Sequence, residues 1–178
     1  MSSVEKERGR LLRRLVGGLP RPLPADPMAL IELLRGRMER IVARPVEVRV
    51  EHFPHDTASG FWVRLPDRDI VIVEATARPD HRLVIFGHEL WHMHVGECKA
   101  HASPEEVTAA ARSIGRTDPE LAEALLTAAR AARDEEEETD AEHFGLHLAF
   151  QLRKLVREDN APLDGLSRRI HTSLGWNG

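Results

Sequence analysis

The chain has 178 residues, of which 42% are hydrophobic and 30% are charged, so it is long enough to fold as one domain around a hydrophobic core. Its net charge of -4 argues against a protein dedicated to direct nucleic-acid binding. A single cysteine, Cys98, excludes an internal disulfide framework, and neither a signal peptide nor an apolar run of membrane-spanning length occurs. We therefore expect a cytoplasmic protein that makes no contact with a membrane.

The first 24 residues differ in composition from the rest of the chain. Arginines surround Leu11, Leu12 and Leu15 in a basic amphipathic pattern, and a segment rich in Gly and Pro follows at 17–24. We expect residues 1–24 to form a basic helix and a linker, and residues 25–178 to form a single domain. Packing on the domain or solvation of this helix is favoured over contact with a membrane or a nucleic acid.

One helix and three strands are predicted next in the chain. The helix begins at Asp26–Pro27, carries apolar residues at helical spacing and ends before Pro45. Residues 46–50 alternate valine with charged residues, as in a strand with one solvated face. Residues 61–65 and 70–73 flank a Pro- and Asp-containing turn and are predicted to form a hairpin. Because 70–73 is continuously apolar, we expect it to be the more central strand.

The second half of the chain is predicted to be helical. Pro79 begins a helix that ends near Gly96, and a capping box at 103–106 begins another that stops by Gly115. A third start signal at 117–120 precedes a helical pattern that continues almost without a break to about Val156, and 164–174 forms a last short helix. The sequence therefore predicts an α+β fold with a small antiparallel sheet packed among several helices.

The predicted helix after Pro79 contains the motif HExxH, as His88-Glu89-Leu90-Trp91-His92. Histidines at positions i and i+4 lie on one helix face with Cβ atoms about 5–6 Å apart, so that both imidazoles can reach one zinc ion. Glu89 lies at the edge of that face, where it can accept a proton from a water molecule and pass it to a leaving amine. A buried helix has little reason to group these three polar side chains unless a ligand satisfies them. We therefore expect one zinc ion per chain.

A catalytic zinc site needs a third protein ligand, and the acidic run at 134–142 offers candidates. The inward stripe of the last long helix, extended backwards from Ala141 by three or four residues, reaches Glu137 and Glu138. Glu138 is the favoured ligand, because Glu142 one turn later can then hydrogen-bond a ligand from outside the metal's contact shell. Glu137 and Glu142 remain alternative ligands on the sequence alone.

These residues resemble a known family. The eight residues from Glu138 to Gly145, Glu-Thr-Asp-Ala-Glu-His-Phe-Gly, are similar to the E-x-E-A-x-x-F-A signature of ImmA/IrrE-type metallopeptidases when they follow an HELxH helix. The stretch from Gly60 to His88 resembles actinobacterial members, which are described as regulatory or toxin components. The resemblance covers roughly residues 27–155. It implies a zincin-like fold of the gluzincin type and a cytoplasmic regulatory protease that cleaves a protein partner such as a helix-turn-helix repressor.

Three features depart from that family. Trp91 stands where a small residue is usual and is expected to narrow the cleft. The 46 residues from His92 to Glu138 form a longer interval than the family implies, consistent with an inserted helix at 104–114. The chain also has no tyrosine, so a donor to the oxyanion must be His, Arg or backbone. These departures keep open a second hypothesis, a zinc-containing regulator-binding or toxin–antitoxin component without proteolytic activity.

Further histidines are candidates for roles in the cleft. His143 and His147 are spaced i, i+4, and His143 is the candidate oxyanion donor in the catalytic set with Glu89. His81 lies two turns before His88 and is expected either to line the cleft or to help to cap its helix. His94 and His101, with Cys98 between them, lack the spacing of a zinc knuckle.

Overall fold

The structure is a computed structural model that describes residues 2–54, 58–96, 103–128 and 135–161. Within these ranges the chain is mixed α and β, with six helices and one three-stranded sheet. In chain order the elements are α1 (Ser3–Val16), α2 (Pro27–Val42), β1 (Val46–Glu51), β2 (Gly60–Arg64), β3 (Asp69–Glu74), α3 (Pro79–Val95), α4 (Pro104–Ile114), α5 (Pro119–Ala128) and α6 (Glu135–Asp159). No helix within the described ranges combines the length and the apolar run needed to cross a bilayer.

The local start and stop signals are confirmed at most helix ends. The Asp26 carboxylate accepts hydrogen bonds from the backbone of Met28 and Ala29 at the start of α2. Ser103 and Glu106 form a reciprocal capping box at α4, and Gly96 ends α3 in the left-handed region with a φ of 86°. The helical pattern predicted from 117 to 156 is divided into α5 and α6, with 129–134 outside the described residues. The last helix predicted at 164–174 also lies outside them.

The sheet is mixed, not antiparallel as the sequence predicted. β3 is the central strand, as expected, and pairs antiparallel with β2 through the predicted hairpin. β1 pairs parallel with β3, with Val46 opposite Asp69 and Glu51 opposite Glu74. The alternation of residues along β1 fixes which face of the strand is buried but carries no information about strand direction. The connection from β1 to β2 leads to the far edge of the sheet, which leaves β1 parallel to β3.

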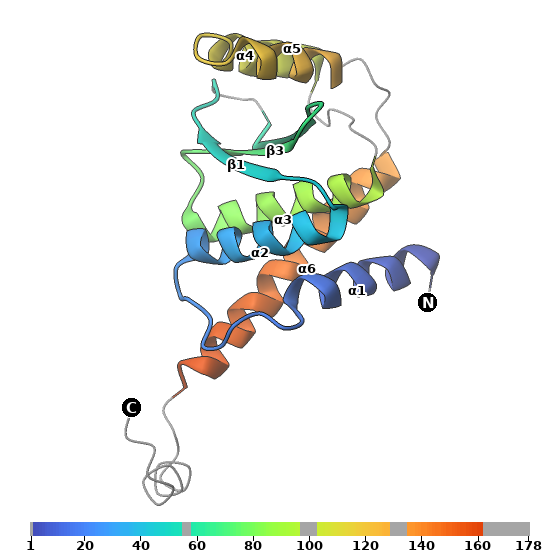
Figure 1. Ribbon diagram of the computed structural model, residues 1–178, viewed down its shortest axis with the longest axis vertical. Coiled ribbons are helices and arrows are strands. Elements are labelled where there is room, and N and C mark those ends of the chain that lie inside the picture. Colours follow the sequence, from blue (N-terminus) through green and yellow to red (C-terminus); the bar gives the residue numbers. More distant parts are fainter. Residues whose placement is uncertain (1, 55–57, 97–102, 129–134, 162–178) are drawn as a thin grey trace, which may run out of the picture.

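The two faces of the sheet contribute to two hydrophobic clusters. Phe61, Val63, Ile70 and Ile72 pack with apolar residues of α4 and α5. The alternate positions on the same two strands, which include Trp62, Val71 and Val73, pack with α2, α3, α6 and α1. Figure 1 shows the resulting layers, with α4 and α5 above the sheet and the other helices below it. The helix that carries HExxH therefore lies directly beneath the sheet.

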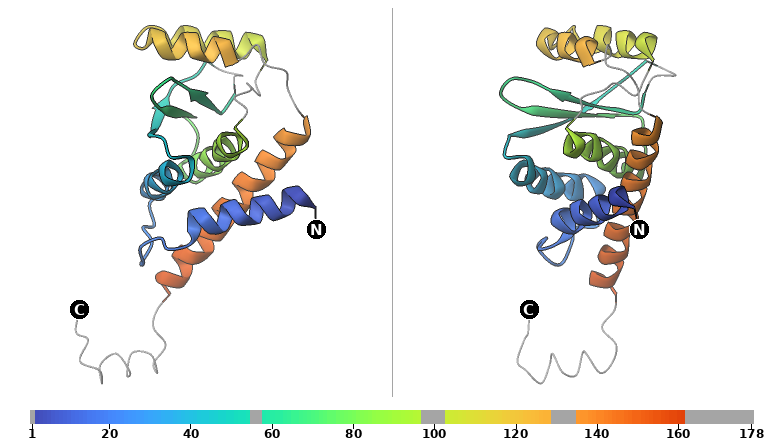
Figure 2. Two further views of the ribbon diagram at one scale, coloured as in Figure 1. Left: turned by 45° about the vertical axis from the view of Figure 1, so that its right-hand side comes forward. Right: turned by 90° about the vertical axis from the view of Figure 1, so that its right-hand side faces the viewer.

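The helix at the N-terminus belongs to the larger of these two clusters. Leu11 and Leu15 of α1 are fully buried, and Leu19 and Leu23 in the following linker are buried in the same cluster. Figure 2 shows α1 crossing α6 and lying on the same side of the sheet as α2 and α3. α1 and the linker that follows it therefore share a core with the other helices of this cluster.

Candidate metal centre

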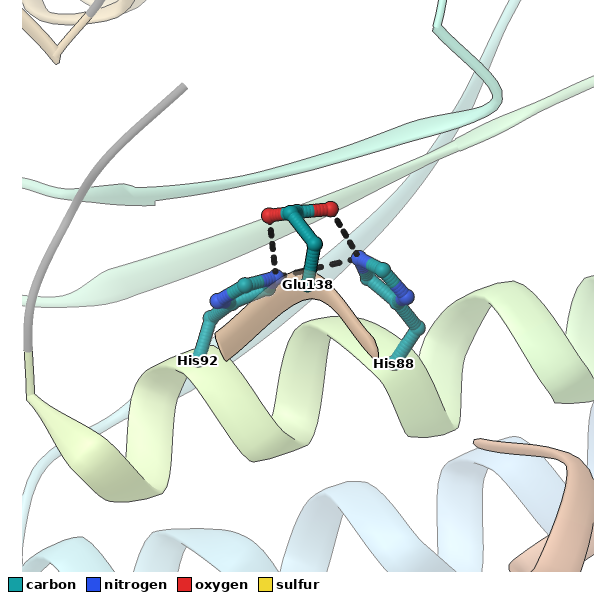
Figure 3. Close-up of side chains that lie close together, drawn as sticks. All are labelled: His88, His92 and Glu138. Atoms are coloured by element: carbon teal, nitrogen blue, oxygen red, sulfur yellow. Dashed lines mark hydrogen bonds and ion pairs between the residues drawn. The ribbon is translucent and has the colours of Figure 1, made fainter. Parts of the chain in front are cut away.

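His88 and His92 point to the same side of α3, as the i, i+4 spacing requires (Figure 3). Their Nε2 atoms lie 3.0 Å apart, and the two rings meet edge to face with centroids 4.7 Å apart. His92 is buried, with 2% of its surface exposed, whereas the His88 side chain is 16% exposed. The two imidazole nitrogens therefore converge on a point at the border between the core and solvent.

The carboxylate of Glu138, on α6, lies between these two rings (Figure 3). Its Oε1 is 3.3 Å from Nε2 of His92, and its Oε2 is 3.6 Å from Nε2 of His88. This approach depends on a close crossing of α3 and α6 at Gly87 and Gly145. A Cβ on Gly145 would lie 2.5 Å from the backbone oxygen of Val84 and 3.0 Å from the backbone nitrogen of His88. Because neither glycine carries a side chain, α6 lies close enough for Glu138 to reach the histidines.

The three side chains form a group that can hold a metal ion. Their donor atoms lie within 4.8 Å of one another, and it is the one group of this kind among the described residues. Two donors of a tetrahedral zinc ion, each about 2.0–2.1 Å from the metal, are about 3.3 Å apart. The two Nε2 atoms lie 3.0 Å apart, and they lie 3.3 and 3.6 Å from the two different oxygens of Glu138, so all three separations are close to that value. Two imidazoles and one carboxylate are also a donor set that zinc accepts.

A second carboxylate, that of Glu137, contacts His92 at its other ring nitrogen. Oε1 of Glu137 lies 3.0 Å from Nδ1 of His92, and the Glu137 side chain is only 12% exposed. When the Glu137 carboxylate accepts this hydrogen bond, Nδ1 of His92 carries the proton that it donates. In the neutral ring Nε2 then holds the free lone pair, directed toward Glu138 and His88. This is the tautomer that a metal ligand requires.

Glu137, and not Glu142, makes the contact to His92 in this structure. Glu142 is exposed and makes no hydrogen bond or ion pair with any described residue; Glu137 makes the contact to a ligand histidine instead. Glu137 and Glu138 are neighbours on α6, so their side chains diverge by about 100° around the helix. Glu137 therefore reaches Nδ1 of His92, whereas Glu138 reaches Nε2 of the same ring. The adjacent acidic pair in the sequence was the signal for this arrangement.

Glu89 is buried beneath the sheet, with 1% of its surface exposed. Its carboxylate lies against the start of β2, because a Cβ on Gly60 would be 3.1 Å from Oε1 of Glu89 and 2.5 Å from a methyl group of Ile85. Gly60 therefore makes room for both the helix and this carboxylate. Burial of an ionisable side chain next to a metal-binding group is typical of a functional position.

A cleft of about 400 Å³ opens in front of these residues. His88, Glu89 and Glu138 form its polar wall, and His81 and Glu142 also line it. The remainder of the lining consists of Ala58, Ser59, Val84, Ile85 and Leu146. The buried carboxylate of Glu89 and two of the candidate ligands, His88 and Glu138, therefore border one solvent-accessible space. Apolar side chains form much of the rest of its lining.

Two expectations about the cleft are corrected by the structure. His143 does not face it: Nδ1 of His143 lies 3.2 Å from Nη1 of Arg8 on α1, and His143 lines a separate hollow with His147. Trp91 does not narrow it, because Trp91 is buried in the core against Phe144, with ring centroids 5.5 Å apart. Helical phase explains both, since each residue lies on its helix away from the ligand face.

His94 does not belong to the metal group. Nε2 of His94 lies 2.8 Å from Oε1 of Glu7, a contact between α3 and α1 that the sequence did not suggest. This hydrogen bond lowers the pKa of the Glu7 carboxyl below its usual value. Cys98 and His101 lie outside the described residues.

Comparison of the chain with protein-family models, with curated proteins and with solved structures finds no match.

Proposed function

We propose that this chain is a zinc-dependent metallopeptidase of zincin-like, gluzincin-type fold, in which His88, His92 and Glu138 hold the metal. The single observation that carries the proposal is the convergence of two imidazole nitrogens and a carboxylate, 3.0–3.6 Å apart, beside the buried carboxylate of Glu89. A purely structural zinc site uses four protein ligands and has no need of an additional acid in an open cleft.

Each residue of this set has a defined task in peptide hydrolysis. Zinc, when bound, lowers the pKa of water and polarises a carbonyl group. Glu89 takes the proton from the attacking water and then delivers it to the leaving amine. Glu137 fixes the His92 ring in the tautomer whose Nε2 can bind the metal. Ser59 and His81 line the cleft, and we propose them in place of His143 as donors of a hydrogen bond to the substrate carbonyl.

The substrate that we propose is a protein partner, such as a helix-turn-helix regulator, so that the enzyme is a cytoplasmic regulatory protease. This part of the proposal rests on the resemblance of the HExxH and Glu138 segments to ImmA/IrrE-type peptidases. A second candidate is a zinc-containing regulator-binding or toxin–antitoxin component without turnover. The position of His143, away from the cleft, favours this candidate because it removes one expected catalytic donor.

The first experiment is elemental analysis of the purified chain beside the double variant His88→Ala, His92→Ala. We expect about one zinc per chain in the wild type and none in the variant. A variant that folds normally and a wild type that binds no zinc would together contradict the metal site.

Glu89→Gln then separates the two candidates. The variant should retain its zinc, because Glu89 is not one of the three ligands, and should lose cleavage of a random-sequence peptide pool followed by mass spectrometry. Wild-type cleavage that a chelator abolishes and that zinc restores supports the peptidase. Full zinc occupancy of the wild type with no cleaved peptide bond favours the component without turnover.

A further inference from the structure

Four residues on α6 follow one another at intervals of four from the metal group outward. Glu138 belongs to the metal group, Glu142 lines the cleft, and Leu146 and Phe150 continue the same stripe. Each step of four residues adds about 40° of rotation about the helix axis, so the stripe winds around α6 and Phe150 lies about 120° around the axis from Glu138. The stripe changes from acidic to apolar as it leaves the cleft.

Leu146 and Phe150, the α6 apolar patch, are the most exposed large hydrophobic residues in the described part of the chain. Leu146 is 58% exposed and Phe150 is 59% exposed, whereas the other exposed large apolar residues do not exceed 42%. The patch borders a hollow of about 570 Å³ between α1 and α6. Leu146 lines both this hollow and the cleft, so its side chain stands at the border between the two spaces.

We propose that the α6 apolar patch binds an apolar segment of the same protein substrate whose scissile bond enters the cleft. This inference rests on the proposed function and names a second contact that the substrate makes. Twelve residues of helix separate Glu138 from Phe150, a rise of about 18 Å. An extended peptide advances about 3.3 Å per residue, so the anchoring side chains stand about five or six residues from the scissile bond.

The size and the surroundings of the patch favour a substrate segment over a second copy of this chain. The exposed parts of one Leu and one Phe side chain offer roughly 200 Å², against the roughly 800 Å² that each partner buries in a stable complex. Arg8, His143 and His147 line the same hollow, so apolar contacts are combined with hydrogen-bonding groups. Because Leu146 also lines the cleft, a substrate chain that leaves the cleft past Leu146 reaches this patch.

The test uses zinc-loaded full-length Glu89→Gln protein and labelled peptides, so that binding is measured without turnover. One pool has a random core of about six residues. The other pools extend this core by about six residues on one side or on the other, and each extension ends either in Phe-Leu or in Ser-Ser. We expect the Phe-Leu extension on one side of the core to tighten binding by about tenfold in fluorescence anisotropy. The double change Leu146→Ser, Phe150→Ser should remove this gain. Phe150→Ser alone, at a residue that lines the hollow and not the cleft, should reduce the gain and leave binding of the short core unchanged.

Leu126→Ser is the matched control, because Leu126 is an exposed leucine on α5 that does not line the cleft or the hollow. It should leave the tenfold gain intact. Equal binding of the Phe-Leu and Ser-Ser pools overturns the inference, and so does a dimer seen by sedimentation that the double change dissociates. Cleavage of the same pools by wild type tests the proposed function separately. If extension-dependent binding occurs without any zinc-dependent cleavage, the peptidase proposal fails and the substrate role of the patch fails with it.

Discussion

His92 is held through both of its ring nitrogens. Its Nδ1 contacts Glu137 at 3.0 Å, and its Nε2 faces His88 and Glu138 at 3.0 and 3.3 Å. Because the ring is almost completely buried, each nitrogen needs a partner in the folded chain. The largely buried carboxylate of Glu137 therefore orients the His92 ring through Nδ1 and leaves Nε2 to face the candidate metal group.

Glu137→Gln tests this role. The amide keeps the size of the side chain but removes the charge that holds the Nδ1 proton, so zinc affinity should fall by about 10–100-fold. A competition titration with a chromophoric chelator measures the change. Glu142→Gln is the control, since Glu142 is exposed and contacts neither histidine. A larger loss of affinity in Glu142→Gln than in Glu137→Gln would reverse the assignment.

At the scale of the elements, the centre depends on the crossing of α3 and α6 at Gly87 and Gly145. A Cβ on Gly87 would lie 3.0 Å from the Cα of Gly145, and a Cβ on Gly145 would meet the backbone of α3. Backbone atoms cannot move aside as the end of a flexible side chain can. The distance from Glu138 to the two histidines is therefore set by these glycines.

Gly145→Ala should separate the two helices. We expect a loss of about 1–3 kcal/mol in the free energy of unfolding, together with weakened zinc binding, because Glu138 is carried away from His88 and His92. Urea denaturation and the chelator titration measure the two effects. Gly36→Ala in α2 is the control: no atom lies within 4 Å of the added Cβ, so stability should rise by about 0.5–1 kcal/mol. Unchanged zinc affinity in Gly145→Ala would argue against the crossing as the determinant.

Asp118 links α5 to the sheet. Its Oδ1 accepts the backbone N–H of Leu121 at 3.0 Å, and its Oδ2 pairs with Arg49 of β1 at 2.7 Å. The hydrogen bond from Leu121 and then the Arg49 guanidinium lower the pKa of Asp118 below its ordinary 3.8. A carboxyl whose pKa is lowered on folding stabilises the fold at pH values above its unfolded pKa, and that stabilisation disappears as the pH falls through the folded pKa.

Asp118→Asn keeps the helix cap and removes the charge. We expect the variant to lose about 0.5–1 kcal/mol of unfolding free energy at neutral pH. The difference from wild type should shrink as the pH falls below 3.8, because the wild-type carboxyl then also becomes neutral. Urea denaturation at several pH values measures both curves. A difference that persists at acidic pH would show that Asn disturbs packing and not the ion pair.

At the scale of the whole molecule, one hydrophobic cluster connects α1, α2, α3, α6 and one face of the sheet. Two polar contacts add to this connection: Glu7 of α1 pairs with His94 of α3, and Arg8 pairs with Asp140 of α6 at 3.2 Å. The basic helix at the N-terminus therefore rests on both helices that supply the metal group. The arginines of α1 lie outside its apolar stripe, so the stripe can pack in the core.

Leu15→Ala tests whether α1 is part of the cooperative unit. Leu15 is fully buried, so the change should lower the free energy of unfolding by about 2–5 kcal/mol in a single transition. Leu12→Ala, at a half-buried position one turn earlier, should cost less. Thermal denaturation followed by circular dichroism and by tryptophan fluorescence distinguishes the outcomes. A separate early transition that leaves the main one unchanged would contradict the shared core.

Local spacing determined part of this protein without any tertiary information. The i, i+4 spacing of His88 and His92 places both rings on one face of any helix, because 3.6 residues complete a turn. Capping residues such as Asp26 and Ser103 satisfy the first backbone N–H groups of their own helices, so they mark helix starts in the sequence itself. The continuous apolar run at 70–73 likewise indicated the central strand, since only a strand buried on both faces can carry it.

The tertiary structure decided the features that depend on how distant segments meet. The acidic run offered Glu137, Glu138 and Glu142, and only the angle at which α6 crosses α3 places Glu138 at the histidines and Glu137 behind His92. The same angle turns His143 toward Arg8. The direction of β1 was decided by the path of the chain across the sheet. Sequence periodicity fixes the face of an element, whereas contacts between elements depend on their relative position, which long-range packing alone determines.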